Sequence, residues 1–151
     1  MGNICRSPAA EAIMKYKIKA RNLFGKIEVD SAGTIDYHIG ETADKRMIKH
    51  AAKRGYKLNS IARQFDASTD FSNFDYIVTM DNENYDDVLS LTVNSENKNK
   101  IFRMVDFCEH LSAENIPDPY YNGASGFEEV LDLLEDTANG LLKKVMNDIN
   151  Q

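Results

Sequence analysis

The first eight residues contain groups that could bind an anion and support chemistry on it. Gly2 and Asn3 stand side by side, and both residue types tolerate the positive φ angles of a tight turn. Ser7 and Pro8 predict a helix start, with the Ser7 hydroxyl as cap and Pro8 at the first helical position. The unpaired backbone N–H groups of a helix N-terminus, together with the planar donor of Arg6, suit a phosphate. A capped helix with a surface arginine is the alternative that this pattern leaves open.

Cysteine and histidine usage gives no sign of a metal or of a disulfide framework. The two cysteines, Cys5 and Cys108, are too few for a disulfide scaffold. His38, His50 and His110 lie far apart, and none has the spacing of metal ligands. We therefore expect a protein with no metal and no cofactor.

Length and charge narrow the class of protein further. A chain of 151 residues suits a single domain over 1–151, and 42% hydrophobic with 28% charged residues is ordinary for a globular fold. No apolar run approaches the ~20 residues of a membrane span, and the N-terminus lacks the apolar stretch of a secretory signal. The balance of 18 basic against 24 acidic residues gives a net charge of −6, which argues against nucleic-acid binding. We expect a cytoplasmic protein that binds neither nucleic acid nor membrane.

Helical and strand patterns alternate along the chain. The first helix follows Ser7-Pro8 and is predicted to bury Ala9, Ile13, Tyr16, Ala20 and Leu23, which recur at spacings of four and three. We interpret the basic residues of that helix, Lys15, Lys17, Lys19 and Arg21, as its solvated face. The remaining prediction is strands over 27–29, 74–80 and 101–105, and helices over 42–54, over 82–90 and from Gly126 onward.

This alternation predicts an α/β fold with a doubly wound parallel sheet that is flanked by helices on both faces. Such a fold normally opens with a strand that leads into its first helix. Here the chain opens with the helix. We therefore expect the first strand to be missing before Met1.

Five ordered motifs resemble one known family, the low-molecular-weight protein tyrosine phosphatases. The signature of that family is a Cys, five residues, an Arg and then Ser or Thr, at the end of the first strand. Residues 2–11, GNICRSPAAE, resemble the latter part of this signature and the helix after it. Further matches follow in order at Asp30-Ser31-Ala32-Gly33-Thr34; Tyr37-His38-Ile39-Gly40; Ala62-Arg63-Gln64 with Phe74-Asp75-Tyr76-Ile77 and Met80-Asp81; and Asp118-Pro119-Tyr120-Tyr121. The resemblance covers nearly the whole chain and implies a fold of phosphotyrosine phosphatase I type.

The resemblance also implies roles for individual residues. In the family a cysteine thiolate attacks phosphorus, loop N–H groups and the Arg hold the phosphoryl oxygens, and an Asp protonates the leaving phenol. Arg6 would be the phosphate clamp and Asp118 the general acid. The phosphate-binding loop would be formed by Gly2, Asn3, Ile4, Cys5, Arg6 and Ser7.

Other matched residues would support this loop or line the cleft. Ser7 would hydrogen-bond to the nucleophile, and Asn3 would brace the loop with help from Ser31. The substrate cleft would be walled by Tyr37, Tyr120 and Tyr121.

Two departures from the family pattern bear on activity. Counting back from Arg6, the nucleophilic Cys would stand one place before Met1, so we expect the 151-residue chain to be impaired. Cys5 corresponds to the second loop cysteine of the family, and we expect it to be an inert or weakly reactive thiol. The second departure is Asn59-Ser60-Ile61 where the family usually has Ser-His-Val, and Ser60 can still donate a hydrogen bond.

The function implied is hydrolysis of phosphotyrosine through a cysteinyl-phosphate intermediate, with a phosphotyrosine-containing protein or a small aryl phosphate as the substrate. One alternative is a non-catalytic module that binds phosphate or a partner. The other is an arsenate reductase, although Cys108 is a poor match to the relay cysteines of those enzymes. Because a missing central strand would leave unpaired edges, we also expect homodimerisation or strand exchange.

Overall fold

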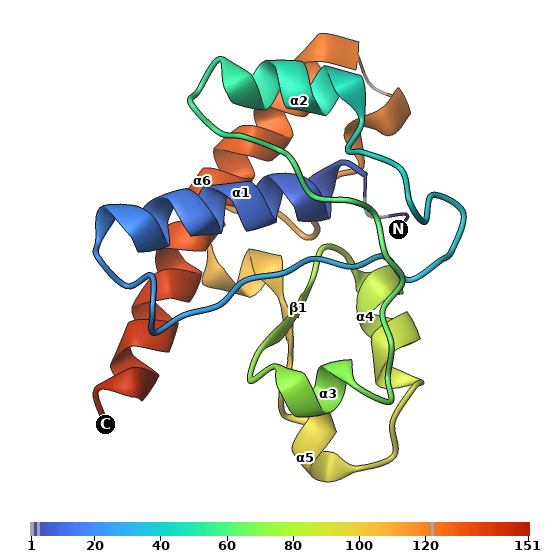
Figure 1. Ribbon diagram of the computed structural model, residues 1–151, viewed down its shortest axis with the longest axis vertical. Coiled ribbons are helices and arrows are strands. Elements are labelled where there is room, and N and C mark those ends of the chain that lie inside the picture. The colour runs from blue at the N-terminus through green and yellow to red at the C-terminus, as the bar shows by residue number, and fades with distance from the viewer. Residues whose placement is uncertain (1, 3, 122) are drawn as a thin grey trace.

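The computed structural model describes residues 2, 4–121 and 123–151, and the chain folds as an α/β structure (Figure 1). Its elements in chain order are α1 (Arg6–Ala20), α2 (Lys45–Ala52), α3 (Asp70–Asn73), β1 (Ile77–Thr79), α4 (Asn82–Leu89), α5 (Ser95–Lys98), β2 (Ile101–Arg103), the 3₁₀ turns η1 (Met104–Phe107) and η2 (Pro119–Tyr121), and α6 (Gly123–Ile149). Among the helices of these described residues, none is long and apolar enough to cross a membrane.

The sheet is parallel, as predicted, and its two faces pack against different helices. β1 and β2 pair in parallel, with Ile77 opposite Ile101 and Val78 opposite Phe102. Ile77 and Ile101 are buried with Phe71 of α3 and Val88 of α4 in one cluster. Val78 points to the other face, where it packs against the main core. The α/β prediction with helices on both faces of a parallel sheet is therefore confirmed.

The strand predicted over 27–29 is wrong. Residues 27–32 belong to no strand, and within the described chain this stretch reaches a neighbouring segment only at its end, through a parallel bridge between Gly33 and Gln64. A strand is defined by its ladder of hydrogen bonds to a neighbouring strand, so an apolar run without such a ladder remains a plain extended segment. The predicted strands 74–80 and 101–105 shorten to β1 and β2 for the same reason.

The start of the first helix also differs from the prediction. α1 begins at Arg6, its N-cap is Cys5, and no side chain caps it, so Ser7 lies inside the helix and Pro8 is its third residue.

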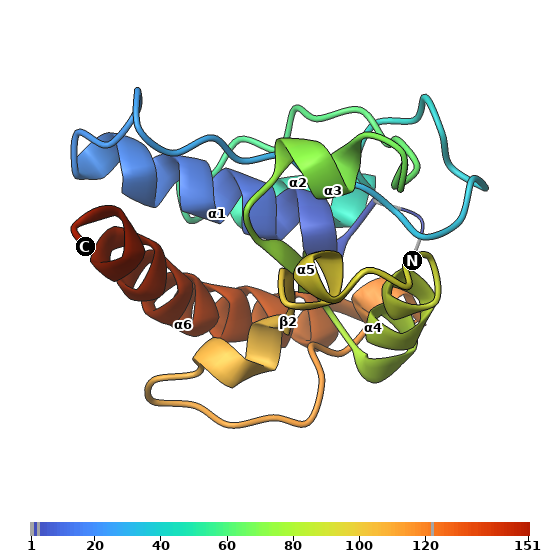
Figure 2. The same ribbon diagram turned by 90° about the horizontal axis from the view of Figure 1, so that it is seen from below.

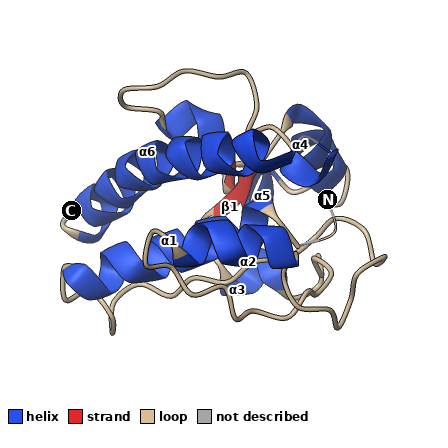
Figure 3. Cartoon of the chain, turned by 90° about the horizontal axis from the view of Figure 1, so that it is seen from above, coloured by secondary structure: helices blue, strands red, loops and turns tan. Residues whose placement is uncertain are grey.

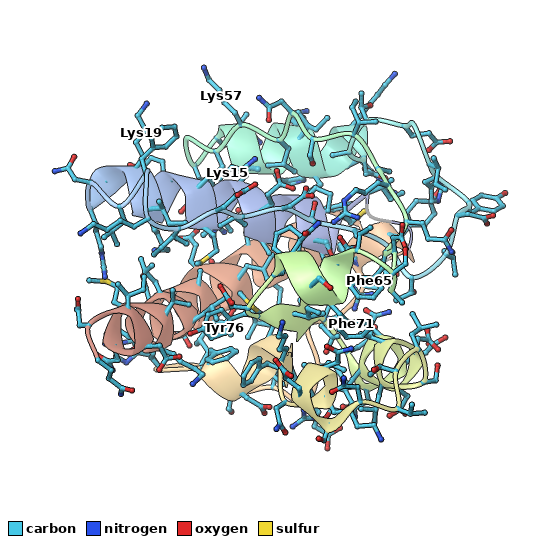
Figure 4. All side chains as sticks on the ribbon, turned by 60° about the horizontal axis from the view of Figure 1, so that its bottom comes forward. Lys15, Lys19, Lys57, Phe65, Phe71 and Tyr76 are labelled. Atoms are coloured by element: carbon cyan, nitrogen blue, oxygen red, sulfur yellow. The ribbon has the colours of Figure 1, made fainter. Side chains whose placement is uncertain are left out.

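The buried face of α1 follows the predicted apolar stripe only in part. The prediction is correct for Ala9 and Ile13, but Tyr16 is 56% exposed and Ala20 is exposed. The buried residues that were not predicted are Ala10, Met14 and Ile18. Tyr16 lies edge-on against the ring of Tyr56 instead of entering the core. The predicted solvated face is present, and Figure 4 shows Lys19 directed away from the molecule.

The long helix α6 organises the core. It packs against α1, α2, η1 and η2, and Figures 2 and 3 show α1 and α6 side by side along the length of the molecule. Its fully buried residues include Phe127, Leu131, Leu134 and Leu142. Gly140 allows α6 and η1 to pack closely, because a Cβ at this position would lie 2.0 Å from the carbonyl oxygen of Phe107 in η1.

The other helices follow the prediction with shifted ends. The helix predicted over 42–54 is α2, whose N-cap Asp44 accepts from the backbone N–H of Arg46. The helix predicted over 82–90 is α4, capped by Asp81, and the last helix begins three residues before Gly126. These capping carboxylates fix where two helices begin, and both lie beside the site described next.

Candidate active site

Arg6 is the central side chain of the site. It is 4% exposed, and its Nη1 donates to Asp81 Oδ2 at 2.7 Å and to the carbonyl oxygen of Ile116 at 2.8 Å. Its Nη2 is buried and has no partner within residues 2, 4–121 and 123–151. A buried guanidinium with an unused donor, at the N-terminus of a 15-residue helix, is suited to bind an anion.

Asp81 fixes one side of this guanidinium. Its carboxylate caps α4 by accepting the backbone N–H of Asn84 at 2.7 Å, and it also accepts from Arg6. Burial pushes the pKa of Asp81 upward, but these two hydrogen bonds and the charge of Arg6 outweigh burial, so the pKa lies below its usual value. Asp81 therefore stays ionised and holds Arg6 in one orientation.

The segment that carries Asp118 is attached to the same arginine. Ile116 donates its N–H to the carbonyl oxygen of Met80 at 2.8 Å, and its own carbonyl accepts from Arg6. Asp118 Oδ1 accepts the N–H of Tyr120 at 3.0 Å, at the start of η2. Arg6 and the predicted general acid are therefore brought into one region by bonds that span more than one hundred residues of sequence.

Cys5 lies in this region as a protonated thiol. It is 6% exposed, and burial together with the nearby carboxylates of Asp44 and Asp118 raises its pKa from 9.0 to about 12. A thiol with a pKa this high is almost entirely protonated at neutral pH, and the thiolate is the nucleophilic form.

Arg46 supports Tyr120 and was not identified as a site residue from the sequence. Its guanidinium lies 5.0 Å from the ring centres of both Tyr120 and Phe127, and it donates two side-chain hydrogen bonds, of 3.1 and 2.9 Å, to the Asp44 carboxylate. Cation–π contacts of this kind position an aromatic side chain. The Asp-x-Arg spacing of Asp44 and Arg46 at a predicted helix start is the signal that could have indicated this pair.

Tyr37 lies at the outer edge of the site. It is 78% exposed, and its ring stands edge-on to His38 with 4.9 Å between ring centres. His38 bonds to Glu41 at 2.7 Å and lies over Gly2, where a Cβ would come within 2.4 Å of its ring. Tyr37 is therefore beside the loop and free to contact a ligand that enters from solvent.

The remaining predicted residues differ in burial and in bonding partners. Ile4 is buried next to Cys5, and Ser7 is half-buried in the first turn of α1. The Ser31 hydroxyl donates a hydrogen bond of 2.6 Å to Glu11 of α1, and Lys15 also donates to the Glu11 carboxylate. Asn3 and the side chain of Tyr121 lie outside what the structure describes. Within the described residues, no group of three or more His, Cys, Asp or Glu side chains could hold a metal.

Comparison with known proteins places this chain in a family. The chain matches the family model "Low molecular weight phosphotyrosine protein phosphatase" over residues 1–151. A Synechocystis sp. protein whose name places it among the low molecular weight protein-tyrosine-phosphatases is 46% identical over 142 residues, covering 94% of this chain and 90% of its own length. The low molecular weight protein-tyrosine-phosphatase of Streptomyces coelicolor is 39% identical, covering 98% of this chain and 91% of its own.

A solved structure shows the same similarity in three dimensions. The crystal structure of a protein tyrosine phosphatase from Entamoeba histolytica, with Hepes in its active site, superposes with a TM-score of 0.94 at 49% identity. The match covers 98% of this chain and 94% of that chain. The chain therefore belongs to the low molecular weight phosphotyrosine protein phosphatase family, which is a family of enzymes.

Proposed function

We propose that this site binds the phosphoryl group of phosphotyrosine, in a protein or in a small aryl phosphate, for hydrolysis. The observation that carries the proposal is the buried Nη2 of Arg6, a charged donor with no partner among the described residues. Gly2, Asn3, Ile4, Cys5 and Ser7 would supply the rest of the phosphate loop, with Asn3 and Ser31 bracing it. The aromatic ring would be received by Tyr37, Tyr120 and Tyr121.

The proposed reaction has two displacements at phosphorus. A thiolate forms a bond to phosphorus while the bond to the phenolic oxygen breaks, and Asp118 gives its proton to that oxygen. Water then attacks the cysteinyl phosphate, the Asp118 carboxylate takes a proton from the water, and phosphate leaves as the thiolate is restored. Arg6 and the loop N–H groups stabilise the equatorial oxygens in both steps.

The chain's own cysteines do not fit the role of nucleophile. Cys5 is held protonated by burial and by nearby carboxylates, and Cys108 follows η1 and has a pKa raised by burial and by Asp136. We propose that the nucleophilic Cys belongs one position before Met1, as the family signature requires. The 151-residue chain then binds a phosphate analogue but hydrolyses substrate poorly.

Titration with orthovanadate or inorganic phosphate tests binding. Arg6→Lys removes the planar fork and is expected to weaken binding at least about tenfold, because the bidentate geometry is lost. Arg21→Lys, the same substitution at the exposed C-cap of α1, is the matched control and should leave affinity unchanged. Equal affinities for the two variants would overturn the proposed clamp.

Turnover of p-nitrophenyl phosphate tests the reaction. A version that also contains the residues encoded upstream of Met1 is expected to turn over this substrate faster than the 151-residue chain. Asp118→Asn in the extended version should lower the turnover rate about 10²- to 10⁴-fold. No gain on extension would refute the missing nucleophile. Substantial turnover by the 151-residue chain would exclude the binding-module alternative, and reduction of arsenate with thioredoxin, without phosphatase turnover, would favour the reductase.

A further inference from the structure

The N-terminus of α2 contacts both the phosphate loop and the segment that carries Asp118. Asp44, the N-cap of α2, donates its backbone N–H to the carbonyl oxygen of Ile4 at 2.7 Å. Two residues further along the chain, the Arg46 guanidinium lies over the ring of Tyr120. Figure 1 shows α2 beside the first turns of α6, and η2 packs against the same helix. The start of α2 therefore connects the loop with η2.

The Arg46 guanidinium has a fixed place although its side chain is 48% exposed. Its Nε and Nη2 donate to the two oxygens of the Asp44 carboxylate, and the Asp44 side chain is only 11% exposed. Two parallel hydrogen bonds between an arginine and a carboxylate fix the plane of the guanidinium as well as its distance. The Asp44 carboxylate also accepts the backbone N–H of Arg46 at 2.8 Å, so the pair is attached to the first turn of α2.

A fully buried ring of α6 supports the same guanidinium. Phe127 is 0% exposed, and its ring centre lies 5.0 Å from the Arg46 guanidinium. His50, one turn further along α2, stacks on the Phe127 ring with 5.4 Å between ring centres and 4° between ring planes. Residues four apart lie on one face of a helix, so α2 packs on the Phe127 ring through two side chains. Arg46 therefore rests on a ring that burial keeps in place.

Tyr120 connects this support to the predicted general acid. The Tyr120 ring centre lies 5.0 Å from the Arg46 guanidinium, and the Tyr120 N–H donates to Asp118 Oδ1 at 3.0 Å. The ring and the N–H belong to one residue of the short 3₁₀ turn η2. A displacement of the Tyr120 ring is therefore transmitted to the bond with the Asp118 carboxylate.

We propose that Arg46 is a positioning residue that fixes Tyr120 as a wall for the aromatic ring of the ligand, and so gives the site a preference for aryl over alkyl phosphate groups. This role rests on the proposed function, in which Arg6 and the loop hold the phosphoryl group and Tyr120 receives the ring. A wall that is already ordered loses little conformational freedom when a ring binds against it. An alkyl group makes no stacking contact with the wall, so loss of Arg46 weakens aryl ligands selectively.

The alternative role for Arg46 is direct attraction of the phosphoryl charge. Burial and the carboxylates of Asp44 and Asp118 raise the pKa of Cys5, and the Arg46 charge opposes them, so this charge acts within the loop. The Asp44 carboxylate at 2.9 Å offsets most of it for an incoming anion. The two roles differ in their dependence on the ligand, because attraction by charge acts on every phosphate ligand and stacking acts only on those that carry a ring.

Phenylphosphonate and methylphosphonate are the probes, because their C–P bonds are not hydrolysed and binding is measured without turnover. Calorimetric titration of the 151-residue chain should show about three- to tenfold tighter binding of phenylphosphonate, from the contact of its ring with an aromatic wall. Arg46→Lys keeps the positive charge and loses the planar stack. It should remove most of this preference and change the methylphosphonate affinity by less than about twofold. Arg21→Lys, at the exposed C-cap of α1, is the matched control and should leave both affinities unchanged.

A double-mutant cycle assigns the effect to the wall. Tyr120→Leu removes the ring and should itself abolish the preference for phenylphosphonate. Addition of Arg46→Lys to Tyr120→Leu should then change neither affinity further, because the contact that couples the two residues is already lost.

Hydrogen exchange followed by NMR tests the positioning without any ligand. Arg46→Lys should speed exchange of the Tyr120 amide at least about threefold, because the bond from this amide to Asp118 opens more often. The Glu109 amide, which donates to the Asp136 carboxylate at 2.8 Å, is the internal reference and should keep its rate. A general loss of stability would instead speed the exchange of both amides.

Three results would overturn the inference. They are an unchanged preference for phenylphosphonate in Arg46→Lys, an equal loss of affinity for both phosphonates in that variant, and an unchanged exchange rate of its Tyr120 amide. A failure of both phosphonates to bind the unsubstituted chain would refute the phosphate clamp of the proposed function instead. The exchange rate of the Tyr120 amide then decides by itself whether Arg46 positions this residue.

Discussion

Alkylation of Cys5 by iodoacetamide should be about a thousandfold slower in the folded chain than in the chain unfolded in urea. The reagent reacts with the thiolate. Burial and the carboxylates of Asp44 and Asp118 raise the pKa of Cys5 from 9.0 to about 12. Each unit is a factor of ten in the thiolate fraction, so the difference of about three units lowers that fraction about a thousandfold at any pH below 9.

The assay is a time course at pH 8, followed by digestion and mass spectrometry of the peptide that contains Cys5. Cys108, which is half-buried, serves as the internal comparison. A second series from pH 8 to pH 10.5 separates the shifted pKa from steric shielding. The rate of Cys5 should keep rising tenfold per pH unit beyond pH 9, where the unfolded thiol levels off.

A variant tests the cause. Asp118→Asn removes one of the charges that raise the pKa of Cys5, so alkylation should become several times faster. Asp132→Asn, on the exposed face of α6 with 61% of its side chain accessible, should leave the rate unchanged. The reasoning is refuted if folded Cys5 reacts within tenfold of its unfolded rate, or if its rate levels off near pH 9.

Two further predictions concern stability, both measured by urea denaturation. Gly140→Ala should cost about 1–3 kcal/mol, because the new Cβ would lie 2.0 Å from the Phe107 carbonyl, whereas Gly25→Ala, with no atom within 4 Å, should change stability by less than about 0.5 kcal/mol. Asp136→Asn should also destabilise the chain, since its carboxylate accepts the backbone N–H groups of residues 109–111. Burial raises the pKa of Asp136, but these hydrogen bonds have the larger effect, so its pKa in the folded chain lies below the usual value. The native chain should therefore lose stability as pH falls below about 4, and the variant should lose less.

The elements with long periodic patterns could be predicted from the sequence, whereas short ones and exact ends could not. The apolar stripe of α6 and the alternation with β1 and β2 gave the fold class. Helices of four residues, such as α3 and α5, have too few turns for periodicity to register. Segment 27–29 has the composition of a strand, but its secondary structure depends on a neighbour that local sequence does not describe.

The site was predictable where chemistry is local and not where contacts are distant. The loop around Arg6 and the Asp118 segment each carry a recognisable motif. The bonds from Arg6 to Asp81 and to the Ile116 carbonyl span 75 and 110 residues, and no local pattern indicates them. The stacking of Arg46 on Tyr120 was missed for the same reason, because a cation and a ring far apart in sequence show no spacing rule.

The three-way attachment of Arg6 links ligand binding to the folding of separate segments. One guanidinium holds the start of α1, the cap of α4 and the residues before Asp118. An anion at Nη2 would therefore bind only when all three segments are in place. At one hundred times its dissociation constant, such an anion adds about 2.7 kcal/mol to the free energy of unfolding. Phosphate should consequently act on this protein as a folding ligand, so that the segments it joins open together in one cooperative step rather than one by one.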